Sequence, residues 1–363
     1  MKKKKLLICI LLFTFFSMLF VFQSSAESTE EKTAMDELYE IIPEEVLDKY
    51  STEELMSAIG IEALFSEIFS AVSGSFGKIS SFFATLLFVA ILISLSEASL
   101  VSDSIKTTAG VVTVSSLSVF YLLYPVIMSV KEALYSASAF FSGLIPIISA
   151  VSAASGSIST AGAEALNMNV TFGIISTVCE LLLLPMSFLM MALALAEGFS
   201  LGALSSLAKG VRSIFTWILG IASAFIVGSV AMQGIAATAV DAAKFRAARQ
   251  AANGLIPIVG STVSSALSAV VGGLIYAKSI VGVTAVSCLV VLAISPLVTL
   301  LLYRLSFSLS ITLMDFLGAG GGVRSFSAFR SALDTLIAVY TLSMLVYTLE
   351  IIVFMKCGVS AIG

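Results

Sequence analysis

Residues Ile280–Tyr303 read IVGVTAVSCLVVLAISPLVTLLLY and contain no charged residue. An α-helix rises about 1.5 Å per residue, so a stretch of this length crosses the roughly 30 Å hydrocarbon core of a bilayer. No water is present there to satisfy the backbone, which restricts spanning segments to helices or closed barrels. The apolar residues follow one another without the alternation typical of a barrel strand. The stretch therefore predicts a transmembrane helix.

Other stretches of the chain have the same character. Five more resemble the first in length and composition: Ile79–Leu95, Ala109–Val130, Val170–Ala196, Ile214–Met232 and Leu333–Met355. Gly143–Gly162 and Gly254–Gly273 are apolar but rich in Ser, Ala and Gly, so each either crosses the membrane or re-enters it as a broken helix. Leu305–Leu317 is short and carries Asp315. The predicted fold class is all-α, a polytopic transmembrane helix bundle.

Composition supports this class and argues against an enzyme. Hydrophobic residues make up 58% of the chain and charged residues only 12%, whereas roughly a quarter of an ordinary globular chain is charged. Histidine is absent, which removes the side chain used most often in acid–base catalysis and zinc binding. The four cysteines, Cys9, Cys179, Cys288 and Cys357, are far apart and suggest no disulfide framework. We expect no catalytic residue, cofactor, metal site or nucleic-acid partner.

The N-terminus has the organisation of an export signal. Lys2–Lys5 are positively charged, Leu6–Phe22 are apolar, and Ser24–Ala26 provide the small residues that signal peptidase requires. Residues 1–26 are thus predicted to be a cleaved signal peptide. The rival interpretation is an uncleaved first membrane helix.

The acidic residues are concentrated just after this signal. Between Glu27 and Glu67 lie 13 of the 23 acidic residues of the chain. Ser51 and Glu54 form a capping-box pattern, and apolar residues recur beyond them at helical spacing. Residues 27–72 are predicted to be an acidic, extracytoplasmic, amphipathic helical region, followed by a membrane domain over residues 73–363. The acidic face either docks an extracytoplasmic partner or only keeps the region in water.

An offset of 111 residues relates two parts of the membrane domain. Pairs of Gly and Pro obey it without a gap: Gly143 and Gly254, Pro146 and Pro257, Pro185 and Pro296. Proline lacks a backbone donor and breaks or kinks a helix, so paired prolines imply paired kinks. We predict an internal repeat, about residues 109–196 and 214–303, that contains Pro-broken segments. The two copies are inverted if the broken segment crosses the membrane and parallel if it re-enters.

Two carboxylates are candidates for a functional role. Glu180 falls within a predicted span, where an ionisable group is expensive and often functional. Its counterpart in the second copy is Val291, which argues against a symmetric ion site. Asp315 precedes a glycine-rich run, Gly318–Gly322, that lacks the pattern of a nucleotide-binding loop. A structural role for Glu180 and a flexible turn at the glycines are the plainer interpretations.

The order of these features resembles the stage III sporulation protein AE family of endospore-forming bacteria. The resemblance rests on the export signal, the acidic helix, the two Leu-Ile-Pro segments at Leu144–Pro146 and Leu255–Pro257, and the closing hydrophobic helix. It implies a multi-pass protein of the mother-cell membrane around the forespore, within the channel called a feeding tube. Its implied partners are other membrane proteins, ring-forming proteins and a cytoplasmic secretion-type ATPase. The alternative is a free-standing secondary transporter with inverted repeats, in which Glu180 or Asp315 couples an ion.

Overall fold

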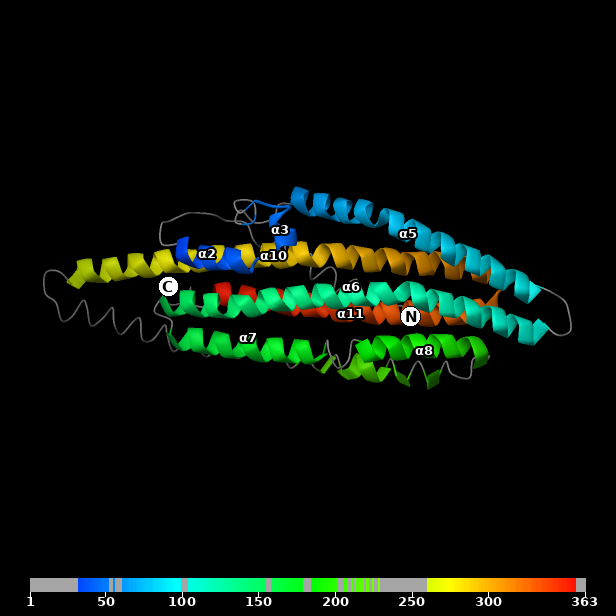
Figure 1. The fold of residues 1–363 in the computed structure, drawn as a ribbon. Coiled ribbons are helices and arrows are strands. Elements are labelled where there is room, and N and C mark those ends of the chain that lie inside the picture. The colour runs from blue at the N-terminus through cyan, green and yellow to red at the C-terminus, as the bar shows by residue number, and fades with distance from the viewer. Residues whose placement is uncertain are drawn as a thin grey trace.

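The structure, a computed structural model, describes residues 32–51, 55, 61–98, 104–154, 158–178, 184–200 and 260–356, with individual positions between 206 and 228. Within these residues the regular structure is entirely helical, which confirms the all-α class. The helices lie roughly along one direction and form an elongated bundle (Figure 1).

Long helices form the body of this bundle. They are α5 (Ile61–Ala98), α6 (Ser104–Ala154), α10 (Gly260–Phe316) and α11 (Gly320–Lys356). The shorter α7 (Ile158–Val178) and α8 (Leu184–Ser200) follow one another along one side, and both contact α6 and α11 (Figure 1). The N-terminal α2 (Lys32–Ile41) and the single turn α3 (Glu44–Leu47) pack against α10, and α2 also contacts α6.

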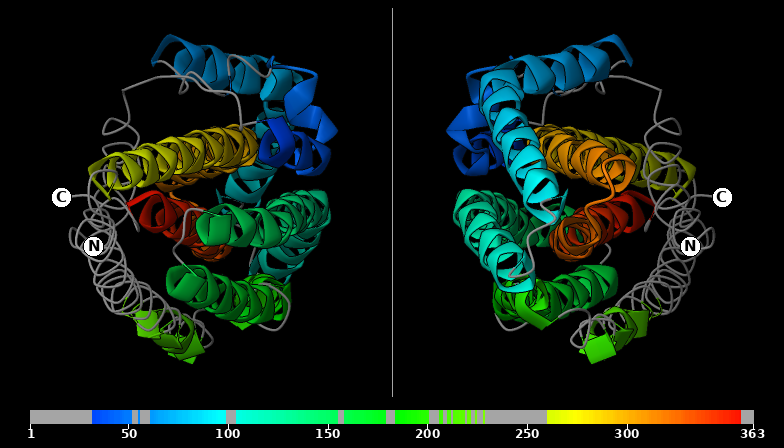
Figure 2. Two further views of the ribbon diagram at one scale, coloured as in Figure 1. Left: turned by 90° about the vertical axis from the view of Figure 1, so that its left-hand side faces the viewer. Right: turned by 90° about the vertical axis from the view of Figure 1, so that its right-hand side faces the viewer.

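Helix α11 forms the centre of the bundle. It contacts α5, α6, α7, α8 and α10, and the end-on views show it enclosed by its neighbours (Figure 2). Its Tyr340 and Tyr347 are fully buried, and Tyr347 stacks on Phe141 of α6 with ring centroids 4.3 Å apart. These contacts pack α11 tightly against its neighbours.

Four helices in the described part of the chain are long and apolar enough to cross a membrane. Their candidate spans are Ala63–Ser96, Gly110–Ala153, Lys278–Phe316 and Gly320–Met355. These contain the predicted spans Ile79–Leu95, Ala109–Val130, Ile280–Tyr303 and Leu333–Met355 almost completely. The chain is therefore a multi-pass helical membrane protein.

The predicted break at Gly143–Pro146 is wrong. Both residues lie inside α6, which runs from Ser104 to Ala154 with Pro125 and Pro146 in its interior. A proline removes one backbone hydrogen bond from a helix. In a helix of 51 residues that packs against its neighbours on many turns, that loss is too small to end the helix.

Two predicted spans also have different limits in the structure. Val170–Ala196 is divided between α7 and α8, and residues 179–183 between them lie outside the described residues. Ile280–Tyr303 and Leu305–Leu317 are instead parts of the single helix α10, which ends at Phe316. The charge of Arg304, which separates them in the sequence, is paired inside the bundle.

The internal repeat stays a prediction. Most of the residues that would match α6 at an offset of 111 lie outside the described residues. The paired prolines occupy different local structures: Pro185 is the second residue of α8, whereas Pro296 lies in the interior of α10. The predicted domain limit at residue 72 falls within α5, which continues to Ala98.

Candidate functional site

The candidate residues chosen from the sequence do not gather at one site. Glu180, Gly254 and Pro257 lie outside the described residues. Pro185 is exposed at the start of α8, and Asp315 is exposed in the last turn of α10. The three that remain, Gly143, Pro146 and Pro296, are helical; Pro146 is exposed, and the other two mark contacts between elements.

Gly143 is the point where α2 approaches α6. A Cβ atom at Gly143 would lie 3.0 Å from Cγ2 of Ile41 and 3.2 Å from its Cβ. That is tighter than ordinary van der Waals contact, so the glycine allows the close approach of the two helices. On either side of Ile41, Leu38 and Ile42 are buried. The glycine therefore serves a helix crossing instead of the predicted helix break.

A second contact fixes the N-terminal segment to α5. We call residues 32–51, which include α2 and α3, the arm. Lys49 donates to one carboxylate oxygen of Glu67 at 2.6 Å, and the Tyr50 hydroxyl donates to the other at 3.1 Å. The Glu67 side chain is only 5% exposed, whereas that of Lys49 is 44% exposed. Because Glu67 is nearly buried, these two donors offset the free-energy cost of removing its carboxylate from water.

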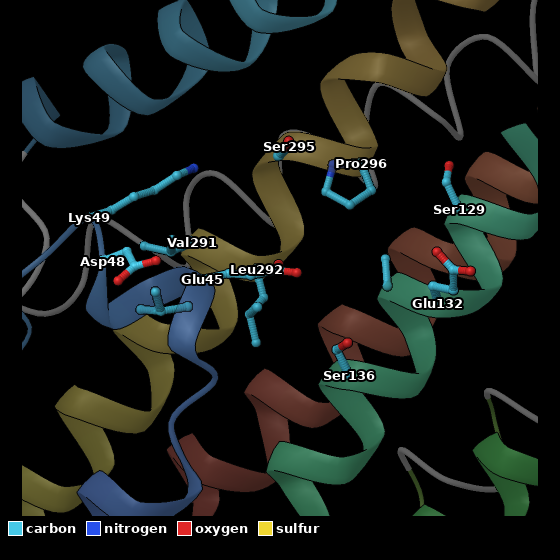
Figure 3. Close-up of a pocket in the computed structure, with 12 residues that line it drawn as sticks. Glu45, Asp48, Lys49, Ser129, Glu132, Ser136, Val291, Leu292, Ser295 and Pro296 are labelled. Atoms are coloured by element: carbon cyan, nitrogen blue, oxygen red, sulfur yellow. The ribbon is translucent and has the colours of Figure 1, made fainter.

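A pocket of about 500 Å³ opens between the arm, α6 and α10 (Figure 3). Its wall is formed by residues from three separate parts of the chain: Glu45, Val46, Asp48, Lys49, Ser129, Glu132, Ala133, Ser136, Val291, Leu292, Ser295 and Pro296. Figure 3 shows Glu132 and Ser136 of α6 opposite Leu292 of α10. Glu45, Asp48 and Glu132 are exposed, which gives the opening an acidic rim.

Pro296 explains one hydrogen bond beside this pocket. Proline has no N–H, so the carbonyl of Leu292, four residues earlier in α10, loses its helical donor. The hydroxyl of Tyr340 on α11 donates to that carbonyl at 3.2 Å. A typical intramolecular hydrogen bond contributes about 0.5–1.5 kcal/mol to stability. Tyr340 therefore compensates for the proline and joins α10 to α11.

Farther along the same two helices, charged side chains are paired inside the bundle. Arg304 donates to Asp334 at 2.5 Å, and their side chains are 27% and 12% exposed. Arg330 donates to the hydroxyl of Ser308 at 3.1 Å. Charged groups at membrane depth usually face the bundle interior and pair with one another. The pair therefore neutralises two charges between α10 and α11.

A cluster of buried polar side chains links α7 to α11. The side-chain amide of Asn167 lies 2.8 Å from each carboxylate oxygen of Glu350, and the Thr171 hydroxyl donates to one of them at 2.5 Å. All three side chains belong to buried residues. Nearby, the buried Lys278 of α10 donates to Ser152 and lies 4.3 Å from the ring centroid of Phe354. Phe354 follows Glu350 by one helical turn.

These polar clusters were not among the sequence candidates. Asn167 and Glu350 are 183 residues apart, and Arg304 and Asp334 are 30 apart on different helices. A single sequence reveals periodicity within one helix but not which helices meet. The available signal was the presence of Arg304, Asp334 and Glu350 in apolar surroundings, which marks an intramembrane residue for attention.

The chemistry of these clusters is that of charge pairing and hydrogen bonding. Among the described residues no group of three or more metal-ligating side chains is present.

The family model for Stage III sporulation protein AE matches residues 42–358. The chain belongs to the stage III sporulation protein AE family.

A curated member of this family is similar along most of its length. The Stage III sporulation protein AE of Bacillus subtilis (strain 168) is 21% identical over 304 residues, which cover 82% of this chain and 75% of the relative. The match includes the arm from Ile42 onwards and the described helices α5 to α11. No solved structure matches the chain.

Proposed function

We propose that this protein is a multi-pass membrane component of the channel that links the mother cell to the forespore. The observation that carries the proposal is the family match over residues 42–358, which includes the candidate spans and nearly all of the chain that follows the predicted signal. The polar clusters described above support a structural role, because each joins neighbouring helices. In this proposal the chain is not an enzyme and binds no cofactor.

The proposed location is the mother-cell membrane around the forespore, with the arm on the extracytoplasmic side. The arm presents several exposed carboxylates: Glu37, Glu40, Glu44, Glu45 and Asp48. Such a surface is soluble and suits contact with basic faces of other proteins. The proposed partners are membrane and ring-forming proteins of the channel and a cytoplasmic secretion-type ATPase.

The alternative of a free-standing transporter receives less support. Asp315, one of its two coupling candidates, is exposed at the end of α10. Coupling ions in transporters bind near the bilayer midplane, between the repeats. Glu180, the other candidate, lies outside the described residues.

Deletion of the gene in its own sporulating host tests the proposal. We expect normal vegetative growth, normal engulfment seen with a membrane dye, and then a loss of heat-resistant spores. Complementation with the intact gene is the control and should restore spore formation. Normal spore yield in the deletion strain would exclude a role in the channel, as would an arrest before engulfment.

A further inference from the structure

The long helices exceed the thickness of a membrane. α6 has 51 residues and α10 has 57. At about 1.5 Å per residue these helices measure roughly 77 and 86 Å, more than twice the roughly 30 Å of the hydrocarbon core. Because all the helices lie roughly along one direction (Figure 1), one part of the bundle must lie outside the core.

The half of the bundle next to one of its ends has a surface suited to contact with lipid. α5, α6, α10 and α11 share one end, at Ala98, Ser104, Phe316 and Gly320 (Figure 1). Twenty residues from that end, about 30 Å along each helix, they reach Lys78, Tyr124, Pro296 and Tyr340. We call this half of the bundle, together with α8, the belt. It exposes large apolar side chains: Phe88, Ile91, Leu92, Leu95, Val114, Leu117, Tyr121, Leu189, Leu305, Leu309 and Phe316.

Where the structure describes their side chains, charged residues of the belt have an ion-pair or hydrogen-bond partner or lie at its edge. Arg304 and Asp334 form the ion pair between α10 and α11. Arg330 donates to Ser308. The exposed Asp315 and Arg324 lie in the last turn of α10 and the second turn of α11, next to the shared end. This distribution is the one expected of helices in lipid.

The other half of the bundle has a different surface. We call α7, α6 from Lys131 onwards, α11 beyond Tyr340 and the first part of α10 the head. Among the head residues whose side chains the structure describes, the exposed positions are mostly small or polar: Lys131, Glu132, Ala139, Pro146, Ala150, Ala153, Gly162, Asn169, Gly173 and Thr177. Tyr135, Leu166 and Val170 are the large exposed apolar residues among the side chains that the structure describes on these helices, and α5 exposes Phe65, Phe69 and Phe76 beyond the belt. Exposed apolar residues are normal on surfaces in water.

The charged residues of the arm indicate whether the head lies in lipid or in water. Helix α2 packs on α6 at Gly143, well beyond Lys131, and its Glu37 and Glu40 are exposed. An unpaired carboxylate in hydrocarbon is costly, so the surface that the arm covers lies outside the core. The exposed Phe65 and Phe69 of α5 flank Glu67, the partner of Lys49 on the arm. They lie 33 and 29 residues before Ala98, beyond the twenty-residue limit of the belt and at the level of the arm.

We infer that acyl chains of the bilayer cover only the belt, and that the head and the arm stand in water on one side of the membrane. The pocket between arm, α6 and α10 then lies at the level of the lipid headgroups. The helical stretches 133–153 and 158–178, apolar by sequence, form the interior of an extramembrane bundle and do not cross the membrane. This inference does not depend on the proposed role in sporulation.

Cysteine labelling tests the inference. In a chain whose four native cysteines are replaced, single exposed cysteines are introduced in the head (Ala139→Cys, Ala150→Cys, Asn169→Cys) and in the belt (Leu95→Cys, Leu117→Cys, Leu309→Cys). Sheared membranes, open on both faces, are treated with a charged maleimide before and after SDS denaturation. The maleimide reacts with the thiolate form of cysteine, and a thiol ionises far more readily in water than in hydrocarbon. We therefore expect head sites to label at least about tenfold faster than belt sites in native membranes. SDS should remove the difference.

A second measurement uses tryptophan, whose one native copy is Trp217. With Trp217→Phe as background, Leu117→Trp and Ala150→Trp are compared in proteoliposomes of lipids brominated on their acyl chains. We expect strong quenching at position 117 and none at 150. Quenching at both positions, or protection of Ala150→Cys and Asn169→Cys from the maleimide until SDS is added, would place the head in lipid and overturn the inference.

Discussion

Replacing Gly143 by leucine should weaken the docking of the arm on α6. A Cβ atom alone would lie 3.0 Å from Ile41, so the further carbons of leucine occupy space that α2 fills. Overpacking of this kind destabilises a contact by about 1–3 kcal/mol. The opposing term is the burial of Leu38 and Ile42, worth roughly 1.5–3 kcal/mol for each side chain. The arm therefore stays docked for most of the time, but its open population rises by about 5- to 150-fold.

Amide hydrogen exchange of the detergent-solubilised protein measures this change. Exchange over residues 32–51 should accelerate by the same factor in Gly143→Leu, while the core of α11 keeps its protection. Gly110→Leu is the matched control, because Gly110 lies in the same helix and a Cβ there meets nothing within 4 Å. Unchanged exchange of the arm in Gly143→Leu, or equal acceleration in both variants, would refute the close contact with Ile41.

Two further variants test the polar clusters by thermal unfolding in detergent. Tyr340→Phe leaves the Leu292 carbonyl without its donor and should lower stability by about 0.5–1.5 kcal/mol. Pro296→Ala restores the backbone N–H, so Tyr340→Phe should lower stability less in a Pro296→Ala background. An equal loss in both backgrounds would contradict the proposed compensation between Pro296 and Tyr340. Asn167→Asp replaces the donor amide by a second carboxylate beside a buried one and should destabilise by about 3–5 kcal/mol. Asn169→Asp, at an exposed position in the same helix, should change stability little. Similar losses of stability in Asn167→Asp and Asn169→Asp would contradict a stabilising contact between Asn167 and Glu350.

The sequence predicts the helices well because hydrophobic length is a property of one segment. Ile79–Leu95 and Leu333–Met355 both fall inside candidate spans of the structure. Glycine and proline are harder to interpret from one chain. Gly143 permits a crossing with a helix about 100 residues earlier, and the lost donor of Pro296 is replaced from another helix. A local rule for either residue cannot include these distant neighbours.

The polar clusters were missed for the same reason. Asn167 and Glu350 are buried together although 183 residues separate them. Asp315, which stands out in the sequence beside its glycines, is exposed where α10 ends. Whether a carboxylate in an apolar stretch is buried or lies at a helix end depends on how the helices pack, which a single sequence does not show.

Membership of the sporulation channel is tested most directly by recovering the protein with its neighbours. Sporangia that have completed engulfment are treated with a membrane-permeable crosslinker, and a C-terminally tagged chain is purified and its partners are identified by mass spectrometry. The account predicts that ring-forming and membrane proteins of the channel are enriched over a control in which an unrelated tagged multi-pass protein is purified. Recovery of the same proteins in both samples, with none of the channel proteins enriched, would contradict the proposed function.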